Sequence, residues 1–499
     1  MTQRTALGGT AALAILAAGP ALADVTAMQV WEKWRSQAEA TGQTITAETE
    51  VQGDTLRLTD FRTEMTLPEG TAVGTIEFLE FRERPDGTVA ITMAPRYAFE
   101  LDMTADGERA EAVLAIEHTG LSMIASGDAE AITYDFLASS MTAALEDFRV
   151  DGEPQDFNAQ LSMGDMDGSY TVTAADTPEI DAEITAGSAS MLVGGSDPED
   201  GAQVDMAVEY ADLTVTMNGV LAMIGSDNTA EMLREGFAFA SDITHGPATY
   251  RFAAVEEDEA INVDAAFDSG SMGTRLDASG MAYDVAASGM TMTMTGSDIP
   301  FPELTLSMEE TALGFVMPVQ ASKKPEDFGM NVTLAGLTVS DMLWSMFDPA
   351  GALPRDPATL ILAVSGQGNW TVDIMDPAVA ESMEGGTPGE LHALTLEDLR
   401  LSLAGAELTG EGAFTFDNTD LETFEGMPRP AGALDLRLVG GQALLDTLVE
   451  MGLLPEEQAM NARMMLGLFA RPGDGEDTLV STIEITEDGG IVANGQKLQ

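Results

Sequence analysis

Hydrophobic and polar residues alternate with a period of two over most of this chain. Residues 45–67 and 71–93 are clear examples, and each breaks at a turn signal, Gly53-Asp54 in the first and Asp86-Gly87 in the second. Alternation of this kind indicates strands with one apolar face, and strands that follow one another without intervening helices favour antiparallel pairing. The predicted fold is mainly β, within the α+β class, and consists of large curved antiparallel sheets.

A loose five-residue motif recurs within the strand segments. A small or acidic residue precedes Gly or Asp, then Leu or Met, and then an alternating strand; the copies lie at 119–123, 211–215, 288–292, 335–339 and 397–401. The spacing between copies is uneven, which does not fit a solenoid of fixed period. The motif is interpreted as one strand type that is reused in successive hairpins.

Helical periodicity is confined to a few segments. In Asp24–Gly42, Met28, Trp31, Trp34 and Ala38 recur at intervals of three and four residues, which predicts an amphipathic N-terminal helix. Its tryptophans suit packing on a sheet; the alternative is a helix at a membrane interface or one that stacks on a ligand. Short inserted helices are predicted at 227–237 and 341–347, and a helical hairpin at 440–471.

Residues 329–370 predict a strand, a short helix, a rigid loop and a second strand. Ser340 can cap the helix, and Asp348-Pro349 ends it because the residue before proline avoids helical geometry. Arg355 lies near Asp348 and Asp356, which predicts a local ion pair, with a clamp for a substrate carboxylate as the alternative. The whole segment is interpreted as a structural junction formed by Trp344, Asp348, Pro349, Pro354, Arg355, Asp356 and Pro357.

The first 23 residues have the features of a secretory signal peptide. Arg4 precedes an apolar run, and Ala21-Leu22-Ala23 predicts cleavage between Ala23 and Asp24. The alternative, a membrane anchor, needs about 20 apolar residues, and this run is shorter. We therefore expect a periplasmic protein without stable membrane insertion after cleavage.

Residues 24–499 are expected to form one large β-rich region, with division into sheets at 24–200 and 201–499 as an alternative.

The charge of the chain excludes some partners. Eighty-four acidic residues against 22 basic ones give a net charge of −62, which repels nucleic acid and anionic lipid headgroups. The chain has no cysteine, so disulfides, thiolate catalysis and cysteine metal sites are excluded.

No set of catalytic residues or cofactor site is predicted. His118, His245 and His392 are far apart in the sequence, and the motifs of phosphate loops, nucleophile elbows and zinc helices are absent. The one candidate metal site is Met290, Met292 and Met294, which alternate along one strand and could offer thioethers to Cu(I). The same pattern also fits the core face of a strand, and methionine is common throughout this chain.

Three segments together carry a resemblance to a known family. They are VWEKW in the first helix, LTVSDMLWSMFDPAGALPRDPATL in the junction, and GGQALLDTLVEMGLLPEE in the C-terminal hairpin. With the exported N-terminus, they resemble the domain of unknown function 2125 family, secreted proteins of alphaproteobacteria. That family has no established activity, so the resemblance implies no catalytic residue. The expected order of elements is also distantly similar to AsmA-like envelope proteins.

Three functions fit these observations. The first is a non-enzymatic protein that binds or scaffolds an unknown component of the cell envelope. The second is a carrier that holds an apolar ligand such as lipid in a groove of the sheet. The third is a hydrolase that uses two carboxylates. An apolar groove open to solvent would favour the carrier.

Overall fold

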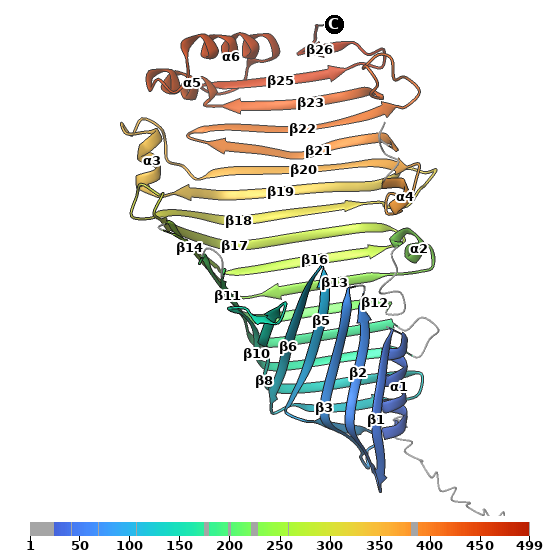
Figure 1. The fold of residues 1–499 in the computed structure, drawn as a ribbon. Helices are drawn as coiled ribbons and strands as arrows, with labels where there is room; N and C mark the ends of the chain where they lie inside the picture. Colours follow the sequence, from blue (N-terminus) through green and yellow to red (C-terminus); the bar gives the residue numbers. More distant parts are fainter. Residues whose placement is uncertain are drawn as a thin grey trace, which may run out of the picture.

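The computed structural model describes residues 24–498 apart from 41, 68, 106, 174–178, 198–200, 221–227, 258 and 381–387 (Figure 1). Most of these residues lie in strands, and the strands form one antiparallel sheet. The predicted fold class is therefore confirmed. The predicted signal peptide, including Ala23, lies outside the described residues, which begin at Asp24.

The helices are α1 (Ala27–Ala40), α2 (Thr229–Arg234), α3 (Asp341–Phe347), α4 (Pro377–Ala380), α5 (Gly441–Glu450) and α6 (Glu456–Phe469). The strands of the first half are β1 (Gln43–Gln52), β2 (Thr55–Leu67), β3 (Gly70–Glu83), β4 (Val89–Met93), β5 (Arg96–Ala105), β6 (Glu108–Thr119), β7 (Ser122–Gly127), β8 (Ala131–Val150), β9 (Glu153–Pro154), β10 (Phe157–Thr173), β11 (Glu179–Ser196), β12 (Gln203–Val220), β13 (Phe239–His245) and β14 (Ala248–Glu256). Those of the second half are β15 (Glu259–Phe267), β16 (Ser269–Asp277), β17 (Gly280–Gly296), β18 (Leu304–Met317), β19 (Glu326–Val339), β20 (Ala358–Trp370), β21 (Gly389–Leu403), β22 (Ala406–Asp417), β23 (Arg429–Val439), β24 (Arg471–Pro472), β25 (Thr478–Ile485), β26 (Ile491–Ala493) and β27 (Gln496–Lys497).

Neighbouring strands in the sheet are mostly neighbours in the sequence. From β17 to β23 each strand pairs with the next, and β23 then pairs with β25. Strands β11 and β12, on either side of residue 200, pair along their whole length. One sheet therefore continues through the position where the sequence allowed a division into two.

The N-terminal end of the sheet folds back on itself. In Figure 1, β1–β6 cross in front of β8–β12. Apolar side chains of both layers pack together in one cluster. Leu58, Phe81 and Tyr134 are completely buried there. Because the layers share one apolar core, this end of the sheet is closed.

Helix α1 fills the side of this closed end, as expected of a helix packed on a sheet. Trp31 is buried, and the ring of Trp34 lies 5.3 Å from Phe81 and 6.1 Å from Tyr134. The alternative of a membrane-interface helix is wrong for these tryptophans. Met28, which was predicted to face inward, is 42% exposed, whereas Val30 is fully buried. The aromatic contacts of Trp31 and Trp34 set the rotation of the helix and turn Met28 outward.

A line of opposed residue pairs, which we call the crease, crosses the sheet near the middle of its strands. Its pairs are Gly120–Ser139, Asp165–Gly187, Asp212–Gly246, Asp268–Gly289 and Glu309–Gly336. Gly120, Asp165, Asp212, Gly289 and Gly336 have positive φ, between 51° and 71°. In four of its copies, the recurring sequence motif places its second residue on this line. A positive φ is tolerated best by Gly, and then by Asp, which explains why these two residues occupy the position.

The crease inverts the alternation of side chains. Val208 and Tyr210 on one side of Asp212 have even numbers, whereas Leu213 and Val215 on the other side have odd numbers. The apolar residues still share one face, because Met163 and Met166, on opposite sides of the crease, belong to one cluster. The crease therefore shifts the alternation by one residue without turning the apolar side chains to the other face.

The predicted C-terminal hairpin is present as α5 and α6. Helix α2 is capped by Asn228, whose side-chain oxygen accepts from the N–H of Glu231 (3.1 Å). Short strands β24 and β26 pair with the outer edge of β25 and limit its exposure. Among the described residues, the helices are too short or too polar to cross a bilayer.

Candidate functional site

The candidate site is the apolar face of the sheet between β17 and β23, called the open face below. Residues that pair across neighbouring strands lie on the same face, so the register assigns each side chain to a face. One row begins at Tyr283 and passes through Phe315, Met330 and Val364 to Leu396. The parallel rows are Val285, Leu313, Val332, Leu362 and Leu399, and then Leu334, Leu360, Leu401, Leu408 and Leu438.

The same face is buried at one end of the sheet and exposed at the other. The row of Tyr283 also continues toward the N-terminus, through Thr274, Ser241, Met217, Ala182 and Tyr170 to Tyr134. On the open face Leu313 is 42% exposed, Met330 44% and Leu401 45%. At about 4.8 Å per strand, this exposed apolar surface is roughly 30 Å long.

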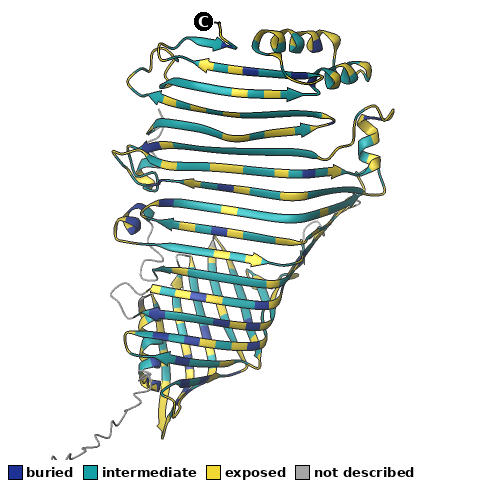
Figure 2. Ribbon diagram, turned by 180° about the vertical axis from the view of Figure 1, so that it is seen from behind, coloured by how far each residue is buried: buried dark blue, intermediate teal, exposed yellow. Residues whose placement is uncertain are grey.

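The opposite face of the same strands is polar; Figure 2 shows the molecule from this side. Asp284, Asn331, Thr395, Thr409 and Asp435 alternate there with the apolar residues of the open face. A sheet with one polar and one apolar face normally covers the apolar face. Figure 1 shows the open face toward the viewer, and no described helix or strand crosses it between β17 and β22.

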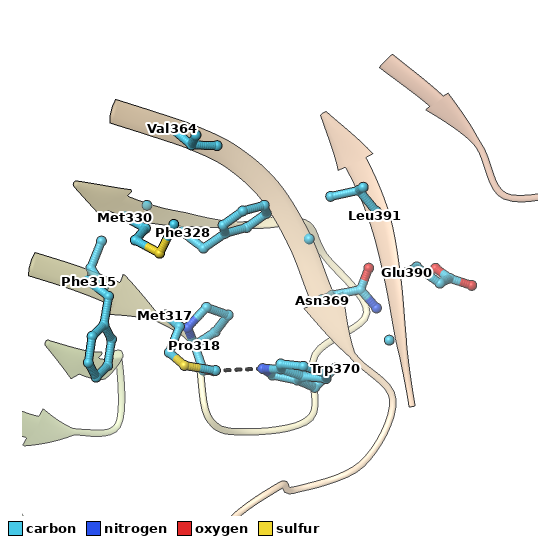
Figure 3. Close-up of a pocket in the computed structure, with 14 residues that line it drawn as sticks. Phe315, Met317, Pro318, Phe328, Met330, Val364, Asn369, Trp370, Glu390 and Leu391 are labelled. Atoms are coloured by element: carbon cyan, nitrogen blue, oxygen red, sulfur yellow. Dashed lines mark hydrogen bonds between the residues drawn. The ribbon is translucent and has the colours of Figure 1, made fainter. Parts of the chain in front are cut away.

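A cavity of about 500 Å³ lies at the end of the open face near α4 (Figure 3). Phe315, Met317, Phe328, Met330 and Trp370 are among the residues that line it. The carboxylate of Glu390, which also lies at the cavity, points away from it in Figure 3. The lining is therefore almost entirely hydrocarbon, aromatic ring and thioether. Cavities of this size hold small ligands.

The wall of the cavity is built by the loop after β18. Trp370 Nε1 donates to the carbonyl of Pro318 (2.7 Å), and the N–H of Ser322 donates to the carbonyl of Trp370 (2.9 Å). Gly366 lies under the ring of Phe328; a Cβ there would come within 2.4 Å of the ring. The ring therefore packs closely on the backbone of β20 at Gly366, where a larger residue would displace it. The polar atom of Trp370 is satisfied internally, so the cavity presents no hydrogen-bonding requirement to a ligand.

Sequence reasoning did not single out Phe315, Phe328 or Met330. Their alternation was visible, but a strand whose apolar face is covered has the same pattern as one whose face is open. The glycines Gly366 and Gly368 were the only local signal, because glycine within a strand marks a place where another group approaches closely.

The three candidate copper ligands lie on the apolar face of β17. Met290 pairs with Met308, Met292 with Leu306 and Met294 with Leu304, and each is partly buried. Their neighbours across the strand are thus apolar, as in the core interpretation, and the copper site stays a prediction. In the described part of the chain, no three His, Asp or Glu side chains gather closely enough to hold a metal ion.

The predicted junction around α3 is held by one carboxylate. Asp348 is only 3% exposed, and its two oxygens accept from the N–H groups of Ala352 and Leu353, each at 2.8 Å. These bonds, that from Leu353 first, hold the pKa of Asp348 below its usual value. The carboxylate closes the loop that begins at Pro349 and leads to Pro354, Asp356 and Pro357.

Arg355 forms an ion pair with a different partner from those near it in sequence. Its guanidinium lies 2.6 Å from Asp341 at the start of α3, and its Cζ lies 5.6 Å from the ring centre of Trp344. Of the two acids expected as partners, Asp348 and Asp356, the first has its oxygens already occupied by backbone N–H groups. Ser340, which was expected to cap α3, makes no side-chain cap bond.

The three histidines remain far apart, and each ring contacts an oxygen. His118 Nε2 lies 3.0 Å from the carbonyl oxygen of Ala94, and His245 Nδ1 lies 2.7 Å from that of Gly246. His392 Nε2 lies 2.7 Å from Asn369 Oδ1. These contacts fit hydrogen-bonded structural residues, and a structural role for the histidines stays a prediction.

Comparison with known proteins gives one match. The family described as "Uncharacterized protein conserved in bacteria (DUF2125)" matches residues 244–495, which include the whole open face and the cavity but not α1. No similar chain was found among curated proteins or among solved structures. The matched range covers just over half of the sequence, and the chain belongs to this bacterial family of uncharacterized proteins.

Proposed function

We propose that this protein binds and carries an apolar ligand, of the acyl-chain type found in lipids, along its open face. The observation that carries the proposal is that one apolar face continues from the buried closed end onto the strands between β17 and β22, which no described helix or strand crosses (Figure 1). A contiguous apolar surface of this length is unusual on a soluble monomer and marks a binding surface.

The chemistry of the cavity supports hydrocarbon rather than a polar ligand. Phe315, Phe328 and Met330 offer apolar contact, and the N–H of Trp370 is already bonded within the protein. Methionine side chains are flexible and polarizable, so they adapt to chains of different length. A ligand bound here would gain by removing its own surface, and that of Met330 and Leu313, from water.

The other two functions considered from the sequence have weaker support. A filled core beneath these strands would have counted against the carrier, whereas Leu313, Met330 and Leu401 of the open face are partly exposed. A two-carboxylate hydrolase needs facing acids in a cleft, whereas the apolar cavity contains one acid, Glu390, whose carboxylate points away. The carrier is proposed to act in the periplasm because of the signal peptide predicted from Arg4 and Ala21–Ala23. The distant likeness to AsmA-like envelope proteins stays a prediction.

Native mass spectrometry of the protein purified from its own periplasm tests the proposal. We expect lipid-sized adducts that organic extraction removes, and binding of a fluorescent apolar probe, N-phenyl-1-naphthylamine, by the extracted protein. Met330→Asp puts a carboxylate on the open face and should weaken probe binding at least tenfold, because a charge against hydrocarbon loses its hydration.

Asn331→Asp is the matched control. It introduces the same carboxylate one residue further along β19, on the polar face, and should leave probe binding unchanged. An extracted protein that binds no probe, or equal weakening by the two substitutions, would refute the carrier. A second copy of the chain or another protein found on the open face instead would support the scaffold.

A further inference from the structure

A second apolar hollow lies between the helical hairpin and the end of the sheet. It measures about 490 Å³ and is bounded by α5, α6 and the ends of β22 and β23. All of its lining residues are apolar, among them Leu438, Leu444, Ala462, Met465 and Phe469. Apolar side chains inside proteins normally pack without space of this size, so the hollow has the character of a place for hydrocarbon.

Polar contacts at both ends of the hairpin hold the helices over this hollow. At the start of α5, the carboxylate of Asp477 accepts from the N–H groups of Gln442 (3.1 Å) and Ala443 (2.9 Å). At the end of α6, Nδ2 of Asn494 donates to the carbonyl of Phe469 (2.8 Å). Because Asp477 and Asn494 flank β25 and β26, both helices are fixed to the sheet, and the hairpin spans the hollow instead of collapsing into it.

Leu438 joins the hollow to the open face. It lines the hollow, and it is also the last member of the row Leu334, Leu360, Leu401, Leu408 and Leu438. The hollow and the open face therefore form one continuous apolar surface.

The register gives the separation of this hollow from the cavity near α4. Val364, which lines that cavity, is connected through Leu396 and Gly412 to Leu434 on β23. Leu434 lies four residues before Leu438 on the same strand. Three strand steps and four residues place the two apolar spaces about 20 Å apart on one face of the sheet.

We propose that the carried ligand is a two-chain lipid, with one acyl chain in the cavity near α4 and the other in the hollow under the hairpin. The inference rests on the proposed carrier function and names its class of ligand. The surface between the two spaces is open to solvent, since Leu401 is 45% exposed there, and a headgroup that joins the two chains stays in water. The net charge of −62 favours a neutral or zwitterionic headgroup over an anionic one.

Displacement of N-phenyl-1-naphthylamine from the extracted full chain tests the inference. Didecanoylphosphatidylcholine is compared with decanoyl-lysophosphatidylcholine, which has the same headgroup and one chain, both below the concentrations at which they form micelles. A two-chain lipid occupies both spaces at once, so it should displace the probe at a concentration lower by at least about tenfold.

Met465→Asp puts a carboxylate at the hollow and should reduce this preference for two chains by at least about fivefold. Met464→Asp is the matched control, because it places the same carboxylate on the next residue of α6, which is 65% exposed and outside the lining. It should leave the preference as it is in the unaltered chain.

Equal displacement by the two lipids in the unaltered chain, or equal preferences in the two variants, overturns the two-chain ligand and leaves the carrier in place. A protein that binds neither the probe nor either lipid refutes the carrier function itself, and the two-chain ligand with it. Should Met465→Asp not fold, Ala462→Leu, which fills part of the hollow with hydrocarbon, takes its place in the same comparison.

Discussion

Replacing Gly289 by alanine tests whether the crease is a fixed part of the fold. Gly289 has φ +64°, and a Cβ there would lie 2.1 Å from Oδ2 of Asp268 and 2.4 Å from its Cγ. The left-handed backbone costs an L-residue about 1–2 kcal/mol. Moving the Asp268 side chain out of its rotamer adds about 1 kcal/mol. The free energy of unfolding should therefore fall by about 2–3 kcal/mol.

Gly467→Ala is the matched control for this substitution. It lies in α6, with no positive φ and no atom within 4 Å of the added Cβ. Alanine is the better helix former, so the same chemical change should raise the free energy of unfolding by up to about 1 kcal/mol. The two variants thus separate the effect of the site from that of the residue type.

Urea unfolding followed by circular dichroism measures both variants, with an unchanged slope required for comparison. In an Asp268→Gly background the clash is absent, and Gly289→Ala should then cost only the backbone strain of about 1–2 kcal/mol. The reasoning is refuted if Gly289→Ala lowers the unfolding midpoint by no more than the shift that Gly467→Ala produces. It is also refuted if both substitutions shift the midpoint in the same direction.

Three further predictions concern the site, the junction and the N-terminus. A dibrominated fatty acid should quench tryptophan fluorescence, and Trp370→Phe should remove most of that quenching. The reason is that Trp31 and Trp34 pack at the closed end and Trp344 lies in α3, whereas Trp370 lines the cavity. Quenching that survives the substitution contradicts a ligand in the cavity. The lowered pKa of Asp348 means that its contribution to stability is full above the unfolded-state pKa of about 3.9 and is lost as pH falls through the folded-state value. Asp348→Asn should therefore lower the free energy of unfolding at pH 7. As the pH is lowered, the free energy of unfolding of this variant should fall less than that of the unaltered chain. Parallel pH profiles for the two proteins would count against this. Intact mass measurement of exported protein should give a chain that begins at Asp24, and a mass that includes Ala21–Ala23 would disprove the predicted cleavage.

Local chemistry made several elements of this fold predictable. Alternation and turn residues such as Asp86-Gly87 predicted the antiparallel strands, and a short helix was predicted within 227–237, where α2 lies. The recurring motif around Gly289 and Gly336 was also visible in the sequence. The structural role of the motif could not be predicted from the sequence. The positive φ and the partner on the neighbouring strand depend on the register, which is set by residues far apart in the chain.

The candidate site was harder to predict for a related reason. Met330 and Leu313 alternate with polar residues in the same way as Leu58 in the closed core, so exposure cannot be read from the alternation. The prolines of the junction made it a distinctive part of the sequence. The hydrogen bonds that Asp348 accepts from Ala352 and Leu353 explain this segment as a structural loop.

The acid–glycine pairs of the crease have a consequence for how such a chain could have grown. Because Asp268–Gly289 and Glu309–Gly336 each join two neighbouring strands, one pair and its strands form a self-contained hairpin unit. Duplication of such a unit within the gene would lengthen the sheet by two strands and keep every apolar side chain on the same side. The width of the sheet would stay constant while its length changed in steps of about 10 Å. Relatives of different length are then expected to differ by whole hairpins.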